Sequence, residues 1–209
     1  MSTFADLRNN IADNLNRTDL TTQINTAINR AIKHYDSENF WFKEAITTFS
    51  TVAAQKGYSS TDGVPSLIAG IDYLEIVITS GSNERKLTEK TYDWVENVDT
   101  GLHQGIPKYY AWYDNEIFLY PIPNAVYTLR LSYKKKYADL SNDSDTNDWT
   151  TEAADLIESR ATWWVALNTL DDDEKATRSK ALEVDALQAL RKKSEALTSS
   201  LNLIQAREY

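Results

Sequence analysis

The spacing of apolar residues along this chain changes twice, and these changes constrain the fold more than any single motif. Near the N-terminus, apolar residues recur every three or four positions in residues 4–15 and again in residues 24–35. This spacing places them on one face of a helix and predicts two amphipathic helices. Thr3, followed three residues later by Asp6, predicts a capping box at the start of the first helix.

After residue 39 the pattern becomes typical of strands. Residues 40–52 are rich in Phe, Trp, Thr and Ile, and polar and apolar positions roughly alternate in their second half, so we expect a strand there. Asp114-Asn115 fits a two-residue hairpin turn, and residues 92–98 fit a short helix. Further strands are expected at residues 73–79, 107–113, 116–120 and 125–133.

Helical spacing returns after an acidic loop at residues 139–148. Apolar positions in residues 156–167 predict one helix, and residues 174–205, which contain no Pro or Gly, predict a long last one. The acidic run at residues 171–174 would lie at its N-terminus, where exposed N–H groups favour negative charge. We expect an apolar stripe on this helix at Leu182, Ala186, Ala189, Leu190, Leu197 and Leu201.

This order predicts an α+β protein. N- and C-terminal helices would form a helical bundle, with an inserted β-rich middle region and a long C-terminal helix. We expect residues 1–38 to form the first part of the helical core and residues 39–140 the β-rich insertion. Residues 141–209 would complete the core and add the long helix and a tail.

Composition excludes several classes of protein. A chain of 209 residues with 42% hydrophobic residues can bury a core without staples, and the absence of cysteine excludes disulfides and thiolate chemistry. No apolar run approaches the length of a membrane span and no signal peptide is evident, so we expect no membrane association and synthesis in the cytoplasm. The net charge of -9 opposes broad binding to duplex DNA.

Catalytic and metal-binding patterns are missing from the sequence. There is no nucleophile elbow, phosphate-binding Gly-rich loop, zinc-protease motif or dinucleotide fingerprint, and His34 and His103 are the only histidines. Residues 143–147 resemble a calcium loop, but Asp148 replaces the required Gly and Ala154 the required Glu. We therefore expect no enzyme, no cofactor and no metal, and a helix N-cap at Asp148 or Thr150.

Two kinds of residue are candidates for contacts with partners. Lys134-Lys135-Lys136, flanked by tyrosines, fits either a nucleic-acid site or a solvated strand edge, and we favour the edge. Trp and Tyr are enriched at interfaces, although each is equally plausible as a core side chain. The candidate interface residues are Trp41, Trp112, Tyr120, Arg191, Lys192, Lys193 and Tyr209.

Two blocks of sequence carry a family resemblance. The first is residues 24–35, followed by Phe40-Trp41-Phe42-Lys43-Glu44 and a Thr-rich strand that ends near Tyr58. The second runs from Gly105-Ile106-Pro107-Lys108-Tyr109-Tyr110-Ala111-Trp112 through residues 117–133 to the helix at residues 149–167. In order and spacing, the blocks resemble the adaptor, or head-to-tail connector, proteins of podovirus-like tailed phages over most of residues 20–170.

The resemblance implies a structural virion protein of the neck or tail. It implies a helical core with a β-rich insertion, and a homo-oligomeric ring of twelve copies that contacts the portal protein on one side and tail or nozzle proteins on the other. Packaged DNA would pass through without specific binding, and an acidic ring interior would repel it. Residues 201–209 would reach toward the portal or a neighbouring copy.

Two alternatives stay open at this point. One is another neck or tail-completion protein of the same general organisation. The other is a hydrolase that acts on carbohydrate or nucleic acid, with acidic residues beside an aromatic cleft. That reading needs a pair of carboxylates roughly 5–10 Å apart beside exposed aromatic rings.

Overall fold

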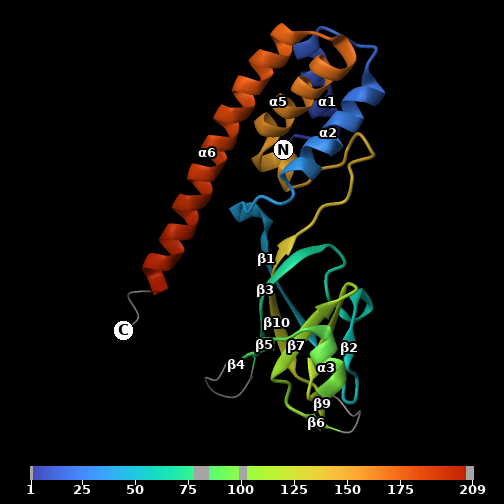
Figure 1. The fold of residues 1–209 in the computed structure, drawn as a ribbon, viewed down its shortest axis with the longest axis vertical. Helices are drawn as coiled ribbons and strands as arrows, with labels where there is room; N and C mark the ends of the chain where they lie inside the picture. Colours follow the sequence, from blue (N-terminus) through green and yellow to red (C-terminus); the bar gives the residue numbers. More distant parts are fainter. Residues whose placement is uncertain (1, 78–84, 99–102, 206–209) are drawn as a thin grey trace. The chain divides into compact units, whose positions relative to one another are not determined.

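The structure, a computed structural model, describes residues 2–77, 85–98 and 103–205, with side chains of the last helix up to Leu197. The chain forms two compact units. The helical unit comprises residues 1–43 and 137–209, and the β unit comprises residues 44–136 (Figure 1). With helices toward both ends and strands in the middle, the α+β prediction is confirmed.

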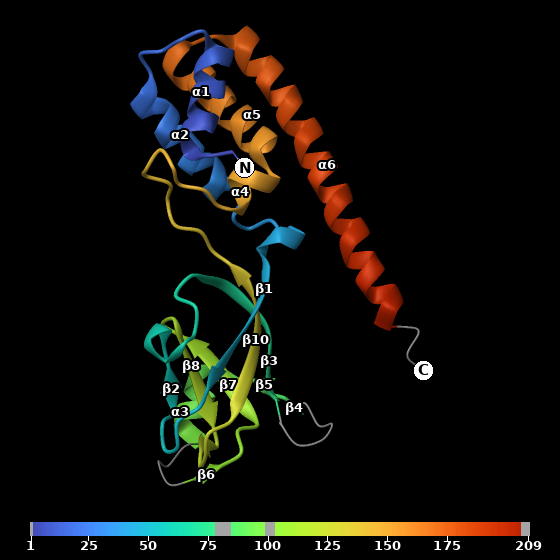
Figure 2. The same ribbon diagram turned by 180° about the vertical axis from the view of Figure 1, so that it is seen from behind.

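The helical unit is built around one central helix. Helix α5 (Ala154–Val165) contacts α1 (Phe4–Leu15), α2 (Thr21–Tyr35) and α6 (Asp173–Gln205). It lies between the α1–α2 pair and α6 in both views (Figures 1 and 2). The smaller elements are the short helix α4 (Asp148–Glu152), the 3-10 turn η1 (Trp41–Lys43) and the π turn η3 (Ala166–Leu170).

The first helix begins as its sequence predicts. Thr3 Oγ1 accepts a hydrogen bond from the Asp6 backbone N–H at 3.1 Å, and the Asp6 carboxylate accepts one from the Thr3 N–H at 2.9 Å. This capping box satisfies two N–H groups that the helix itself leaves without partners. At the other end Asn16 adopts a left-handed conformation with a φ of 53°, a position that asparagine tolerates better than most residues.

The indole of Trp149 is fully buried in the core of the helical unit. Its ring centroid lies 5.7 Å from that of Phe40 and 5.1 Å from that of Phe42, with both pairs edge to face. Tyr137 follows the β unit in the sequence, and its ring centroid lies 6.3 Å from that of Trp149. Residues just before and just after the β unit therefore pack on one tryptophan.

The predicted strand at residues 40–52 is wrong in its first part. Residues Trp41–Lys43 form the 3-10 turn, and strand β1 covers Glu44–Ser50. Phe40 and Phe42 are 1% and 7% exposed because they pack on Trp149. Lys43 is also buried, and its ammonium donates to the backbone carbonyl of Asp36 just after α2.

The predicted apolar stripe on α6 is only partly correct. Leu190 is buried and Ala186 packs against the core, but Leu182 is 52% exposed and Leu197 40% exposed. The side chain of Leu201 lies outside those the structure describes. Apart from Leu190, the buried residues of this helix are small or polar and recur at helical spacing: Ala176, Ser179, Glu183 and Ser194.

The contacts of the Glu183 carboxylate explain how a charged residue can lie on the buried face of α6. Its carboxylate accepts a hydrogen bond from the Tyr35 hydroxyl, lies 3.0 Å from the ammonium of Lys180 and is 3.3 Å from the guanidinium of Arg160. Burial raises the pKa of the Tyr35 hydroxyl, and the neighbouring carboxylate raises it further. Since a buried charge is tolerated only when it is paired, these partners are what allow α6 to pack on α2 and α5.

The β unit contains two four-stranded sheets that share one core. In the first sheet, β10 (Thr128–Lys135) lies between β1 and β3 (Ile68–Val77), followed by β4 (Arg85–Lys86). The second has the order β2 (Gly57–Tyr58), β8 (Glu116–Tyr120), β7 (Tyr109–Tyr113) and β5 (Thr88–Glu89). The two-residue strands β6 (Gln104–Gly105) and β9 (Ile122–Pro123) form a separate parallel pair.

The longer strands of the β unit overlap those predicted, whereas the two-residue strands and the first half of β3 were not predicted. The strands predicted at residues 107–113, 116–120 and 125–133 correspond to β7, β8 and β10, and α3 (Tyr92–Val98) is the expected short helix. The strand predicted at residues 73–79 falls within β3 up to Val77, and its last two residues lie outside the described residues. The turn between β7 and β8 has positive φ at both Asp114 (50°) and Asn115 (62°), as a tight two-residue hairpin requires.

Replacing Glu183 with Ala should strongly destabilise the helical unit. The substitution leaves Arg160 and the Tyr35 hydroxyl without their buried partner, which typically costs about 3–5 kcal/mol of unfolding free energy. The measurement is denaturant unfolding followed by circular dichroism. Glu195→Ala, at an exposed position of the same helix, is the control and should change the free energy by less than about 0.5 kcal/mol. Equal effects of the two substitutions would show that the Glu183 contacts contribute no net stability.

Candidate interaction surfaces

The described part of the chain holds no group of three or more His, Asp or Glu side chains that could bind a metal ion. In the acidic loop that resembles a calcium site, the carboxylates of Asp143 and Asp145 already have partners within the chain. Asp143 pairs with Arg8 at 2.7 Å, and Asp145 accepts hydrogen bonds from the Ser141 and Asn142 N–H groups at 2.8 Å. These bonds lower the pKa of the Asp145 carboxyl, the one from Asn142 most. The loop is therefore bound to the start of α1 by its own side chains.

The helix that follows this loop is capped by a different residue from those expected. Asn147 is the N-cap of α4, and its side-chain oxygen accepts from the Thr150 N–H at 3.1 Å. Asp148 is instead the first helical residue, where its charge suits the helix dipole. Its carboxylate accepts a hydrogen bond from the Tyr137 hydroxyl at 2.7 Å. The sequence placed the cap one or three residues too late because all three residue types are capable of capping.

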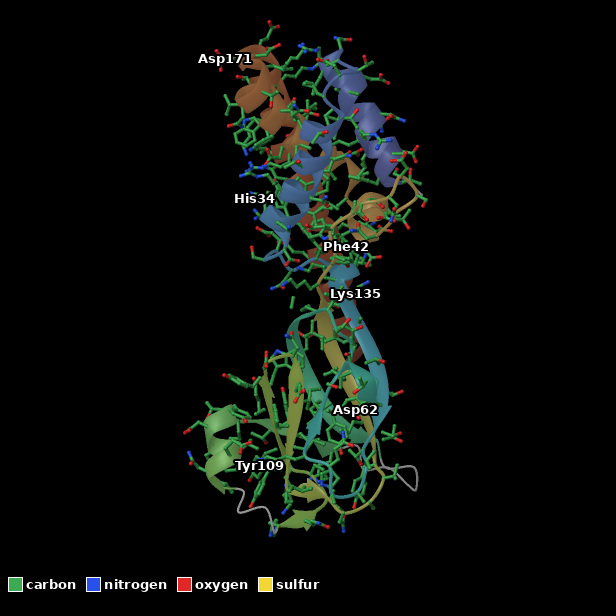
Figure 3. The ribbon with its side chains drawn as sticks, turned by 90° about the vertical axis from the view of Figure 1, so that its right-hand side faces the viewer. His34, Phe42, Asp62, Tyr109, Lys135 and Asp171 are labelled. Carbon is green, nitrogen blue, oxygen red and sulfur yellow. The ribbon has the colours of Figure 1, made fainter. Side chains whose placement is uncertain are left out.

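The two histidines lie in different units. His34 is on α2 (labelled in Figure 3), with its ring edge-on to Tyr35 at 4.8 Å. Partial burial lowers the pKa of His34, and the positive charge of Arg160 lowers it further. His103 is exposed, and its ring lies 5.8 Å from that of Tyr120.

Three of the predicted interface residues form one contact region of the helical unit. The ammonium of Lys193 lies 4.2 Å from the centroid of the half-buried Trp41 ring and 3.1 Å from Glu152. Arg191 forms a 2.7 Å ion pair with Glu38. These contacts attach α6 to the loop after α2 and to α4, so they have a role within the subunit whatever they bind outside it. Lys192 is exposed, and Tyr209 lies outside the described residues.

The other two predicted aromatic residues lie in the β unit, on opposite faces of the second sheet. Trp112 is half-buried against the shared core. Tyr120 is on the outer face, where the rings of Trp94 and Tyr109 lie 5.8 Å and 6.4 Å away. This face carries the odd-numbered residues of β7 and the even-numbered residues of β8, because Tyr109 pairs with Tyr120 and side chains alternate along each strand.

These rings belong to a larger group that we call the aromatic face. Helix α3 packs on β7 and β8, with Tyr92 stacked on Tyr113 at 4.5 Å and Trp94 edge-on to Tyr109 at 5.0 Å. Figure 3 labels Tyr109 on the strand beside α3. Tyr113 is 56% exposed at the end of the group. The aromatic face comprises Tyr92, Trp94, His103, Tyr109, Tyr113, Phe118 and Tyr120.

The three consecutive lysines do not lie on a sheet edge. Lys134 and Lys135 end β10, which pairs with β1 on one side and β3 on the other. Lys134 forms a 2.8 Å ion pair with Glu44 across the first of these pairs. The strand-edge interpretation was therefore wrong, because the neighbours of β10 come from distant parts of the sequence.

The sequence interpretation missed a groove of about 570 Å³ in the helical unit. It lies between α2 and α5 and is lined by Arg30, Lys33, His34, Arg160, Trp163 and Trp164, among others. Two adjacent tryptophans in a helix point about 100° apart, so one of them cannot face the core as fully as the other. The Trp163-Trp164 pair, which begins three residues after Arg160, is the sequence feature from which this groove could have been predicted.

The α+β chain therefore combines an open groove in its helical unit with clustered aromatic side chains in its β unit. The chain belongs to the SU10 adaptor protein family, whose family model matches residues 2–205. This confirms the resemblance seen in the sequence and makes the chain a phage adaptor, a structural component of the virion.

None of the curated proteins with which the sequence was compared matches it. Within the described residues, every helix is too short or too polar to cross a bilayer.

Replacing Glu158 with Gln should raise the melting temperature at neutral pH. Burial raises the pKa of the Glu158 carboxyl, so the folded state disfavours its charged form. This cost is present above the folded-state pKa and disappears below the unfolded-state pKa. Glutamine removes the charge but still accepts the 2.8 Å hydrogen bond from Asn10.

The measurement is thermal unfolding of both proteins from pH 7 down to pH 4. The advantage of the Gln variant should shrink as the pH falls and the wild-type carboxyl becomes protonated. Asp185→Asn, at an exposed position facing the same side of the helical unit, is the control for a general loss of negative charge. A gain from Glu158→Gln that does not depend on pH would contradict this explanation.

Proposed function

We propose that this chain is the head-to-tail connector that joins the portal to the tail, acting as a homo-oligomeric ring around the DNA channel. The family match over residues 2–205 is the observation that carries the proposal. This role needs no reaction. Each copy needs two surfaces for its neighbours in the ring and separate surfaces for the portal and the tail.

Helix α6 supplies one such surface. It has 33 residues, which corresponds to about 50 Å at 1.5 Å per residue. Ser194 is the last of its described side chains to be buried, yet the helix continues to Gln205. Within the helical unit α6 extends well past the ends of α1, α2 and α5 (Figures 1 and 2). We assign this projecting end to the portal contact.

The β unit supplies a second surface. Its aromatic face combines large rings with polar tips, a composition that is enriched at protein interfaces. The ammonium of Lys90 lies 5.4 Å from the Trp94 ring centroid and adds a charged group to it. We assign this face to contacts with tail proteins.

The net charge of -9 supports passage of DNA without binding. A polyanion binds where cations cluster, and an acidic surface repels it. DNA would therefore slide through the ring without adhering to it.

The test of the portal contact is the mass of complexes formed with the cognate portal protein, measured by light scattering. Full-length chain should give a complex with multiple copies per portal ring. A chain that ends at Ala196 keeps every buried residue of α6 that the structure describes, so it should remain folded by circular dichroism. It should lose portal binding by tenfold or more, which corresponds to about 1.4 kcal/mol.

Two results would count against these assignments. A full-length chain that ignores the portal would move the function to another neck or tail position. A truncated chain that binds the portal as well as the full-length chain would place the portal contact elsewhere on the molecule.

A further inference from the structure

The groove between α2 and α5 has an unusual charge for this protein. Arg30, Lys33 and Arg160 line it together with His34, and no carboxylate is among the described residues that do. The chain as a whole carries a net charge of -9. The lining of the groove is therefore cationic on an acidic molecule, and two of its three cations pair with carboxylates outside the lining, Arg160 with Glu183 and Lys33 with Asp139.

Tryptophan and arginine are paired in this groove. The Arg30 guanidinium lies 4.8 Å from the Trp164 ring centroid, and the Arg160 guanidinium lies 4.3 Å from that of Trp163. Both rings are only half-buried. Leu167, at the end of the groove, is 39% exposed. Trp and Arg are the residue types that most often dominate the energy of protein interfaces.

The groove is held in shape before anything binds. Arg160 is fixed by the buried carboxylate of Glu183 at 3.3 Å, whereas the 2.8 Å ion pair of Lys33 with Asp139 joins two exposed side chains. A second hollow, of about 540 Å³, continues past Trp163 and Leu167 onto α6. Side chains that are already ordered lose little entropy on binding, so such a surface favours association.

We infer that this groove binds an acidic surface of a second copy of the same chain and is one side of the subunit contact in the ring. The inference rests on the proposed function, because a closed ring requires a head-to-tail contact between two different patches of each copy. The helical unit carries 20 of the chain's 31 acidic residues, against 13 of its 22 basic ones. A second copy therefore provides the charge that the groove complements.

Nucleic acid fits the groove less well. Binding to a phosphate backbone needs a row of cations that follows the strand, and the surrounding charge of this chain repels a polyanion. Three permanent cations beside two tryptophans in one short concave surface suit a compact acidic protein segment better.

The test compares the substitution Arg30→Glu with Arg17→Glu in full-length protein. Both residues are exposed and both changes alter the net charge equally, but Arg17 lies outside the groove and pairs with Asp19 at 2.7 Å. Assembly of each variant is followed by light scattering, alone and with the portal. Arg30→Glu should raise the concentration needed for half-maximal ring assembly on the order of tenfold or more, while Arg17→Glu should leave it near the wild-type value.

A second readout identifies what occupies the groove. Unlabelled and nitrogen-15-labelled copies are mixed with portal and treated with a carbodiimide, which joins amines to carboxylates in direct contact. Lys33, which lines the groove, and Lys180, which lines the adjoining hollow, should form cross-links between labelled and unlabelled copies. Cross-links from these lysines to the portal, or loss of duplex DNA binding as the only effect of Arg30→Glu, would overturn the inference.

The remaining outcomes separate this inference from the proposed function. If Arg30→Glu assembles on the portal at the same concentration as wild type, the ring contact lies elsewhere, while the adaptor function stands. If the wild-type chain assembles neither alone nor with the portal, both the inference and the proposed function fail.

Discussion

The burial of Trp149 is the contact on which the rest of the structure depends. Its ring packs against Phe40 and Phe42, which precede the β unit, and against Tyr137, which follows it. The Tyr137 hydroxyl oxygen lies 3.4 Å from the Phe42 carbonyl oxygen, so the chain leaves and re-enters the helical unit at neighbouring points. This closure allows an insertion of about ninety residues without separating α1 and α2 from α5 and α6. The core is therefore made of contacts that are distant in sequence, a feature that slows folding.

The polar packing of α6 follows from the same arrangement. A helix that both completes a core and projects beyond it cannot carry a wide apolar face along its whole length, because the projecting part would expose that face to water. Apart from Leu190, the buried positions of α6 are small or polar, and the carboxylate of Glu183 pairs with Arg160 and Lys180. Arg160 and Lys180 also lie 4.3 Å and 5.3 Å from the Trp163 ring centroid. The ion network that attaches α6 therefore also orders the cationic groove.

The two units divide the requirements of an adaptor. The helical unit combines a projecting helix with a concave cationic groove, and the β unit presents rings on a sheet stiffened by α3. An interface built on helices and strands holds its residues in place more accurately than one built on loops, so little ordering remains to be done when partners meet. Membership of the SU10 adaptor protein family fits this division, since an assembly protein needs stable surfaces.

The sequence by itself determined the elements whose causes are local. The capping box at Thr3, the amphipathic spacing of α1 and α2, and the positive-φ hairpin at Asp114 and Asn115 each depend on residues a few positions apart. The order of these elements and the two blocks of sequence at residues 24–58 and 105–167 also indicated the adaptor family. Only the tertiary structure decided that β10 is a central strand, that residues 41–43 belong with the helices, and that Glu183 is buried. The cationic groove also became apparent only in the tertiary structure, because α2 and α5 form it together. Each of these depends on partners brought together from distant parts of the chain, and apolar spacing along one segment carries no information about them.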